Sequence, residues 1–393
     1  SRRAPGGATP ATLKPSTADV ARHIGESIAA PAADSVDKEA RFPTESIDAL
    51  KDGALLSALV PTELGGAGLS VREVAEVCEI LGRHCASTAM VFAMHQIQVA
   101  CILRHGATPF FSDYLSHLVT SQDLIASATS ETGVGGDVRR SVCSVEQQGE
   151  QFRLEKKAPV ISYGQNANAF LITARRSTDA APSDQVLVLA HQSDVRLDPT
   201  SDWNALGFRG TCSLGFNLFA TGDTAQILPD EFAQISSHTM LPVSHILWSS
   251  LWAGIAADAL SRARNVFRAE ARKTAGVLSP GAVRAAKASG ALQLMRSNIV
   301  ECIREYESNR DNADVMSSLG FAIRMNNLKV ASSTGVVNIV GQAMLIAGMA
   351  GYRTDSPLSL GRHLRDAYGA VLMINNDRVD AATASLLMVH KDD

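Results

Sequence analysis

The stretch Ile125-Ala126-Ser127-Ala128-Thr129-Ser130-Glu131-Thr132-Gly133-Val134-Gly135-Gly136-Asp137 reads as a short strand that runs into a glycine-rich turn. Glycine adopts positive φ without a steric penalty and lets backbone come close to another group. Free amides in such a turn can therefore point at a bound ligand. A glycine-rich turn between strands is more often only a turn, so this stretch alone does not establish a site.

The period of the apolar residues changes on both sides of this stretch. Residues 17–120 follow a helical pattern, and Ser70-Val71-Arg72-Glu73 reads as a capping box that starts one of the helices. Residues 124–228 alternate with a period of two, and from residue 236 the helical period returns. Short runs rich in β-branched residues predict strands at 154–162, 170–174, 185–190 and 214–220. This order indicates a segregated α+β fold with an antiparallel β module, not alternating βαβ units.

Composition limits the function classes. The chain has 393 residues, so we expect two or three domains. The net charge is -4 at pH 7 and no run of Lys and Arg stands out, which gives nucleic-acid binding no electrostatic support. The 6 cysteines form no CxxC pair, so we expect reduced thiols and no metal site.

The sequence carries signals that bear on cellular location and on membrane partners. No signal peptide is visible, which favours a cytoplasmic protein. Residues 1–16 are rich in Pro, Gly, Ala and Thr and read as a disordered tail. The most apolar runs, 246–255 and 340–350, are too short or too broken by Gly and Ser to span a bilayer, so no membrane partner is expected.

The glycine-rich stretch resembles a motif of the acyl-CoA dehydrogenase family. Ser130, Glu131, Gly133, Gly135 and Asp137 match the family's Thr-Glu-Pro-Gly-Ala-Gly-Ser-Asp in order. Five further resemblances occur in the right order along the chain, at residues 60–69, 160–170, 206–211, 346–352 and 365–367. The resemblance implies an N-terminal helical domain at 17–122, a middle β-barrel or sandwich domain at 123–232, and a C-terminal four-helix bundle at 233–393.

The resemblance also implies FAD as cofactor and assigns residues to it. Thr129 and Ser130 take the positions of the groups that bond the flavin pyrimidine, and Ser162 keeps the hydroxyl near N5. Val160 replaces an aromatic residue that packs on the flavin, and Gly136 replaces a serine beside Gly135. The remaining implied contacts belong to the pyrophosphate and adenine end, partly of a neighbouring subunit's FAD: Arg272, Gly348, Gly351, Asn376 and Arg378.

The family's catalytic glutamate is missing. Many members place it seven residues after the alanine of Arg-Asp-Ala, where this chain has Ile374. The alternative position on an earlier helix corresponds to Ser244. Asp377 lies three residues beyond Ile374, nearly one turn if the helix continues, and is a candidate base. The competing interpretation is a solvated Asp377 or one that bonds Arg378. His95 and His245 lie in apolar helices and read as core residues.

Three functions remain open. The first is an FAD-dependent oxidoreductase that acts on an acyl thioester carried by CoA or by an acyl carrier protein. The second is a flavin monooxygenase or oxidase of the same fold, although the monooxygenases carry a C-terminal histidine pair that is absent here. The third is a flavin- or thioester-binding protein without catalysis. The resemblance further implies a homodimer or homotetramer.

Overall fold

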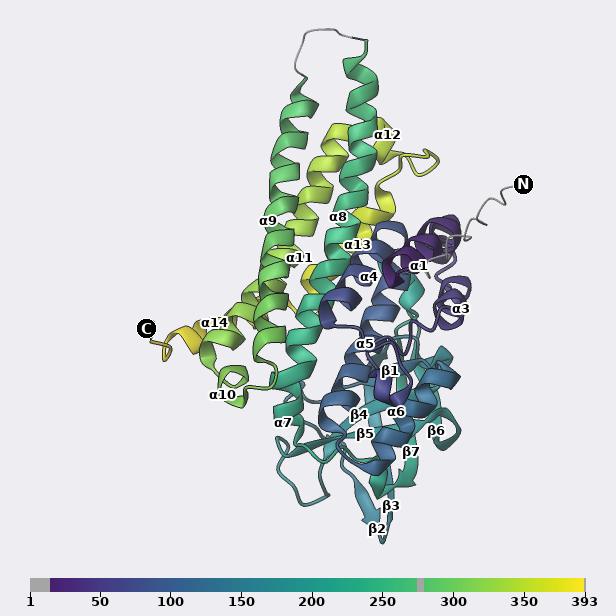
Figure 1. Cartoon of the computed structure of the whole chain (residues 1–393), viewed down its shortest axis with the longest axis vertical. Coiled ribbons are helices and arrows are strands. Elements are labelled where there is room, and N and C mark those ends of the chain that lie inside the picture. Colours follow the sequence, from purple (N-terminus) through teal and green to yellow (C-terminus); the bar gives the residue numbers. More distant parts are fainter. Residues whose placement is uncertain (1–14, 274–278, 392–393) are drawn as a thin grey trace, which may run out of the picture.

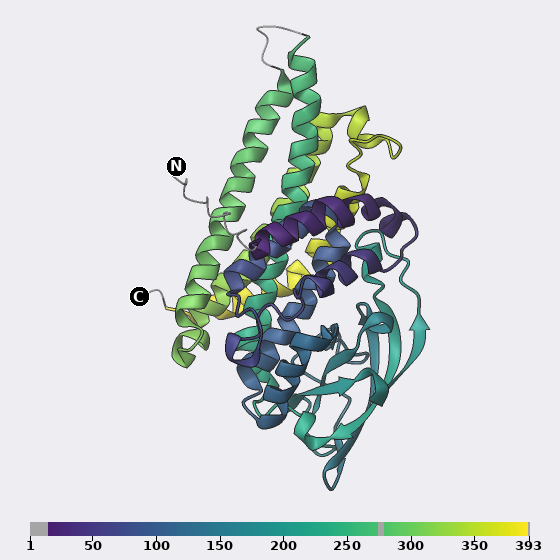
Figure 2. The ribbon, with the colours of Figure 1, turned by 45° about the vertical axis from the view of Figure 1, so that its right-hand side comes forward.

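The computed structural model describes residues 15–273 and 279–391. The predicted tail at 1–16 lies almost entirely outside them. Helices occupy both ends of the sequence and two small sheets lie between them, as predicted for an α+β fold. Figures 1 and 2 show the β module at one end of the molecule, with the long C-terminal helices extending away from it.

The N-terminal helices, with one exception, pack on the main apolar core. They are α1 (Thr17–Ile24), α2 (Ala30–Lys38), α3 (Thr44–Asp52), α4 (Val71–His84), α5 (Ala86–His105) and α6 (Pro109–Ser121). The exception is α2, whose buried Ala33 and Val36 form a small separate cluster with Ala29 and Cys85. The capping box that starts α4 is confirmed, since Ser70 Oγ accepts from the Glu73 amide and the Glu73 carboxylate accepts from the Ser70 amide. Gly82 and Gly254 let α4 cross a C-terminal helix closely, because a Cβ on either would strike the other helix's backbone.

The β module contains two sheets. One has the order β1-β4-β5 and the other β2-β3-β7-β6. The strands are β1 (Ile125–Ala128), β2 (Glu146–Gln148), β3 (Gln151–Ile161), β4 (Ala169–Arg175), β5 (Gln185–His191), β6 (Val195–Ser201) and β7 (Leu214–Asp223). The four predicted strands correspond to β3, β4, β5 and β7. The expectation of purely antiparallel pairing is wrong, because β1 pairs with β4 in parallel.

The C-terminal region is again helical. It consists of α7 (Phe232–Ile235), α8 (Leu241–Ala271), α9 (Pro280–Asn309), α10 (Ala313–Met316), α11 (Leu319–Ala347), α12 (Met349–Tyr352), α13 (Gly361–Leu372) and α14 (Asn376–Leu387). Helices α8, α9 and α11 pack along one another, and α13 and α14 pack on α11 (Figure 1). The condition that would place Asp377 one turn beyond Ile374, a continuous helix, is not met. The chain turns between α13 and α14, with Ile374 at φ +42°.

Three helices in the described part of the chain are long and apolar enough to cross a membrane by length and composition. They are Ala86–His105, Phe232–Ala271 and Leu319–Ala347. The prediction that the apolar runs are too short is therefore wrong, because these helices extend well beyond 246–255 and 340–350. The apolar windows of the first two are 89% buried inside the protein, whereas that of the third is 44% buried.

Candidate functional site

A largely apolar cavity of about 520 Å³ lies where the β module, α5, the start of α8 and the α13–α14 turn meet. Helix α5 contributes Met90, Met94 and Ile97, and the start of α8 contributes Leu241 and Trp248. Cavities of this size, with mostly apolar walls and a few polar groups, are typical of small-molecule and cofactor sites. Six residues that were assigned from the sequence to the flavin or to the base positions lie together in its wall: Thr129, Ser130, Val160, Ser162, Ser244 and Ile374.

Hydroxyl groups gather at the β-module side of the cavity. Ser130 Oγ donates to the Val160 carbonyl at 2.9 Å, which ties the end of β1 to β3. Ser162 and Ser213 share a hydrogen bond of 2.7 Å between their hydroxyls. Val160 itself is 40% exposed although it is apolar. An exposed aliphatic side chain beside clustered hydroxyls fits a flat ring system that is apolar on its face and polar at its edge.

The wall of the cavity holds no proton acceptor of ordinary carboxylate or imidazole type. Among its described lining residues there is no Asp, Glu, His, Lys or Cys, and the titratable side chains are Arg365 and Tyr368. Ile374 fills the position predicted from the family motif. Ser244 Oγ donates 2.5 Å to the Met240 carbonyl within its own helix, so this hydroxyl is already engaged.

Asp377 does not line the cavity. It is exposed, and its amide is capped by the Asn375 side chain at 2.8 Å, at the first turn of α14. The helix break after Leu372 removes the argument that placed Asp377 one turn above Ile374. Its role as base stays a sequence-based prediction that this geometry does not favour.

The glycine-rich turn is held by Arg378. The Arg378 guanidinium donates to the carbonyls of Gly135, at 2.7 Å, and of Gly136. Both glycines have positive φ, and a Cβ on Gly136 would collide with the guanidinium. The structure thus joins three predicted site residues outside the cavity wall. Arg378 engages this chain's own backbone, and this contact was not foreseen.

The other predicted cofactor residues lie apart from the cavity. Asn376 bonds Lys329 and Ser333 behind the α13–α14 turn. Arg272 follows α8, whose first turns line the cavity. From Ser244 to Arg272 the helix rises roughly 40 Å at about 1.5 Å per residue. Gly348 precedes α12 and Gly351 lies within it, at the same end of the molecule (Figure 1). In one copy Arg272, Gly348 and Gly351 therefore lie a helix length from a ligand in the cavity.

The two histidines predicted as core residues are confirmed as such. His95 Nε2 lies 2.7 Å from the Leu56 carbonyl, and the Ile125 amide donates to its Nδ1 at 3.0 Å. His245 Nδ1 lies 2.9 Å from the Met325 carbonyl. Burial lowers the pKa of each to about 4, so both are neutral at pH 7. The described residues contain no group of three His, Cys, Asp or Glu side chains that could hold a metal ion.

Sequence reasoning missed a buried ion pair under the start of the glycine-rich turn. Lys156 on β3 is fully buried, and its Nζ lies 3.6 Å from the Glu131 carboxylate. The same ammonium donates to the Thr173 hydroxyl and carbonyl, each at 2.7 Å. The Glu131 carboxylate also accepts from the Cys143 amide at 2.5 Å. Residues 152, 154, 156 and 158 alternate as the inward face of β3, so this signal was present in the sequence.

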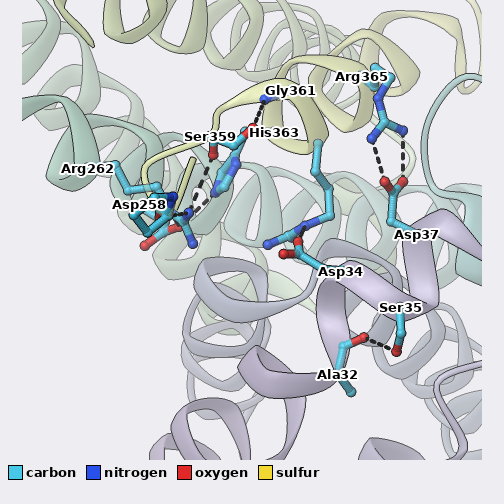
Figure 3. A network of polar contacts seen from close by, with 12 residues as sticks. Ala32, Asp34, Ser35, Asp37, Asp258, Arg262, Ser359, Gly361, His363 and Arg365 are labelled. Carbon is cyan, nitrogen blue, oxygen red and sulfur yellow. Dashed lines mark hydrogen bonds and ion pairs between the residues drawn. The ribbon is translucent and has the colours of Figure 1, made fainter. Parts of the chain in front are cut away.

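A second missed network fixes the opposite wall. Arg365 forms a double ion pair with Asp37 on α2, and its guanidinium also donates to the Leu206 carbonyl at 2.9 Å (Figure 3). The Asp366 carboxylate accepts from the Phe208 amide at 2.7 Å. In Figure 3, His363 and Arg262 converge on Asp258 beside this clamp. The Arg-Asp pair of the C-terminal motif therefore holds the loop that contributes Leu206, Gly207 and Phe208 to the cavity.

Asp366 predicts a pH effect on stability. Burial raises its pKa to about 6, although Arg362 and the Phe208 amide act in the opposite direction. Since the ordinary value is 3.8, the folded protein binds more protons than the unfolded chain between about pH 4 and pH 6. The contribution of Asp366 to the free energy of unfolding therefore falls as pH rises through this window. Asp366→Asn should remove that fall, measured by urea unfolding from pH 4 to 7. Parallel pH profiles for both proteins would contradict the assignment.

Comparisons with known proteins agree with these motifs. Residues 16–122 match the family "Acyl-CoA dehydrogenase, N-terminal domain". The chain is 27% identical over 363 residues to the mitochondrial short-chain specific acyl-CoA dehydrogenase of Homo sapiens, covering 88% of this chain and 82% of that protein. It is 25% identical over 248 residues to the cyclohex-1-ene-1-carbonyl-CoA dehydrogenase of Syntrophus aciditrophicus, covering 62% of this chain and 60% of that protein.

Solved structures share the fold at lower identity. FMN-bound TdsC from Paenibacillus sp. A11-2 superposes with a TM-score of 0.84 at 18% identity, covering 96% of this chain and 98% of that chain. Butyryl-CoA dehydrogenase from Megasphaera elsdenii gives 0.79 at 18%, covering 94% and 97%. The prolyl acyl carrier protein oxidase AnaB gives 0.77 at 17%, covering 94% and 96%. At these identities the likeness shows the fold alone.

Proposed function

We propose that this protein is an FAD-dependent oxidoreductase acting on an acyl thioester, because residues 16–122 match the acyl-CoA dehydrogenase N-terminal domain and the chain shares the fold of butyryl-CoA dehydrogenase. The thioester is carried by CoA or by an acyl carrier protein. The observation that supports this function is the apolar cavity with hydroxyls at one side, where Thr129, Ser130 and Ser162 meet. Its relatives include acyl-CoA dehydrogenases, and a carrier-protein oxidase shares its fold.

The residues present fit a flavin. Ser130 and Ser162 would bond the polar edge of the ring, and Val160 would pack on its face. Bound flavin would supply a hydride acceptor to the site. The chain's own contribution is to bind and orient: Met90, Met94 and Ile97 from α5 form an apolar wall for an acyl chain. The Asp37–Arg365 clamp would keep the opposite loop in place.

The missing carboxylate limits the chemistry. Removal of a proton from the α carbon of an acyl thioester needs a base within about 3 Å of it or one water away. Ile374 and Ser244 occupy both positions that the family motifs assign to that base, and neither accepts a proton at neutral pH. The substrate is therefore one whose oxidation does not depend on a carboxylate of this cavity.

A flavin monooxygenase is the second candidate, and the lack of a carboxylate base among the described residues of the cavity wall favours it. TdsC, whose fold this chain shares, is a dibenzothiophene monooxygenase. Anaerobic mixing with a panel of acyl thioesters that includes hydroxylated acyl groups tests the dehydrogenase, and flavin bleaching supports it. Product formation that requires both a reductant and oxygen supports the monooxygenase. If no thioester bleaches the flavin and no product forms with reductant and oxygen, both enzymes are contradicted and a binding protein is left.

Loss of two hydroxyls should weaken flavin binding. Hydrogen bonds of this kind contribute about 0.5–1.5 kcal/mol each. The double variant Ser130→Ala and Ser162→Ala should therefore retain flavin roughly tenfold less tightly, measured by equilibrium dialysis. Ser237→Ala is the matched control, because Ser237 is exposed and bonds only its own helix. Full flavin occupancy with an unchanged spectrum in the double variant would show that the placement is wrong.

We also propose that a second copy completes the FAD site. Arg272, Gly348 and Gly351 lie a helix length from the cavity of their own chain, so they can serve only a neighbour's cofactor. The apolar side chains of Met349 and Tyr352 beside them are 65% and 70% exposed, as at an interface. Light scattering at micromolar concentration should give a dimer or tetramer. A monomer that still holds FAD would contradict this proposal.

A further inference from the structure

The α13–α14 turn is held from behind by a buried cation. Lys329 on α11 has no exposed surface. Its Nζ donates to the Ile374 carbonyl at 2.9 Å and to Asn376 Oδ1 at 2.5 Å. Ser333, one turn further along α11, also bonds the Asn376 side chain, at 3.0 Å to its amide nitrogen and 3.1 Å to its oxygen. Two residues of one helix thus hold both sides of the turn.

The backbone at this turn is strained. Ile374 has φ +42°, while Met373 and Asn375 on either side have ψ of 121° and 128°. Left-handed backbone is disfavoured for β-branched residues, because the branched Cβ crowds the carbonyl that follows. Such a conformation persists where surrounding contacts determine it. The Ile374 side chain lines the cavity, whereas its carbonyl oxygen accepts a hydrogen bond from Lys329 on α11. The strained residue therefore links the cavity wall to α11.

The charge of Lys329 is poorly compensated. Among the described residues, no carboxylate lies within ion-pair distance of its Nζ, and Asp380 on α14 acts only from farther away. Burial lowers the pKa of Lys329 to about 8, against the opposing effect of Asp380. Burial and, less strongly, the Lys329 charge lower the pKa of His245 on α8. A buried ammonium that lacks a counter-ion is costly, which indicates a role beyond packing.

We propose that Lys329 is a positioning residue of the cavity: its ammonium holds the strained α13–α14 turn through the Ile374 carbonyl and thereby sets the Ile374 side chain in the cavity wall. Asn376 and Ser333 complete the support. Lys329, Asn376 and Ser333 lie outside the cavity wall, and none of its described lining residues comes from α11, so the geometry at the position of the missing base depends on residues behind the wall. Only the ligand-binding part of its test rests on the proposed function.

The test combines removal of the cation with removal of the strain. Lys329→Met deletes the donors, and Ile374→Gly allows positive φ at no steric cost. In Lys329→Met, hydrogen exchange at the amides of residues 373–376 should become at least about tenfold faster, and octanoyl-CoA should bind about tenfold more weakly, since ligand geometry is lost. In the Ile374→Gly background, Lys329→Met should change the exchange rate and the octanoyl-CoA affinity by clearly smaller factors, because there is less backbone strain to offset. Lys287→Met, on an exposed face of α9, is the control.

Equal losses in the wild-type and Ile374→Gly backgrounds, or unchanged exchange at the turn, would overturn the proposal.

A readout without ligand is the pH dependence of melting. Because the pKa is near 8 folded and near 10.5 unfolded, the unfolded chain binds more protons between these values, so stability rises with pH in this window. Lys329→Met should lose that rise. If wild type binds no octanoyl-CoA, the proposed function fails while exchange and melting still decide this proposal. If Lys329→Met does not fold, Asn376→Ala, which removes the shared acceptor, takes its place.

Discussion

The Ile374→Glu variant should gain anaerobic reduction of its bound flavin by saturated acyl-CoA, which the wild-type protein performs slowly or not at all. The new carboxylate would stand in the cavity wall at the position where the family motif places its base. A positioned general base accelerates proton transfer by about 10²–10⁴-fold. Stopped-flow absorbance with octanoyl-CoA measures the rate. A modest loss of thermal stability is also expected, because a charge is placed in an apolar wall.

Ile374→Gln is the matched control for this gain. Glutamine has nearly the same shape as glutamate but cannot take up the proton, so its reduction rate should stay at the wild-type level. Equal rates for the Glu and Gln variants would show that the α13–α14 turn does not present residue 374 to the α carbon. Fast reduction in the wild type would show that another base acts, and Asp377→Asn would then test the remaining sequence-based candidate.

The largest loss of stability is expected from Lys156→Met. Removing one partner of a buried ion pair leaves the other charge uncompensated and typically costs about 3–5 kcal/mol. Here the stranded group is Glu131, whose carboxylate is buried and also bonds the Cys143 amide. The Thr173 carbonyl and hydroxyl would lose the ammonium donor as well, while the hydroxyl still donates to the Thr129 carbonyl at 3.4 Å. Urea unfolding measures the change.

Lys157→Met is the control for this prediction, because Lys157 is the next residue on β3 and faces solvent. It should change the free energy of unfolding by less than about 0.5 kcal/mol. Adding Glu131→Gln to Lys156→Met should recover part of the loss, because no charge then stays buried. A loss below about 1 kcal/mol for Lys156→Met would mean that water reaches the pair, contrary to its burial.

Local patterns were sufficient for much of the fold. The capping box at Ser70 and the alternation along β3 depend on neighbours in sequence, and both are found as predicted. Strand β6 was missed because it contains Pro199 and is largely exposed; it lies at the edge of its sheet, where proline is tolerated. The parallel pairing of β1 with β4 depends on how distant segments meet, and no local pattern encodes it.

The candidate site was predictable where motifs supply adjacent residues and unpredictable where distant helices meet. Thr129, Ser130 and Ser162 belong to two motifs, and the structure brings them into one cavity wall. The break before α14 carries no proline or glycine between residues 370 and 376 to announce it. Its support comes from Lys329, 45 residues earlier than Ile374, so the end of the helix before Asp377 depends on a contact between distant residues.

Flavin binding is tested most directly by the visible absorbance spectrum of the purified protein after incubation with excess FAD or FMN and gel filtration. We expect a flavin spectrum at about one flavin per chain, with FAD retained more tightly than FMN because a second copy holds the adenine end. A protein that emerges colourless after incubation with either flavin would contradict the proposed flavin binding.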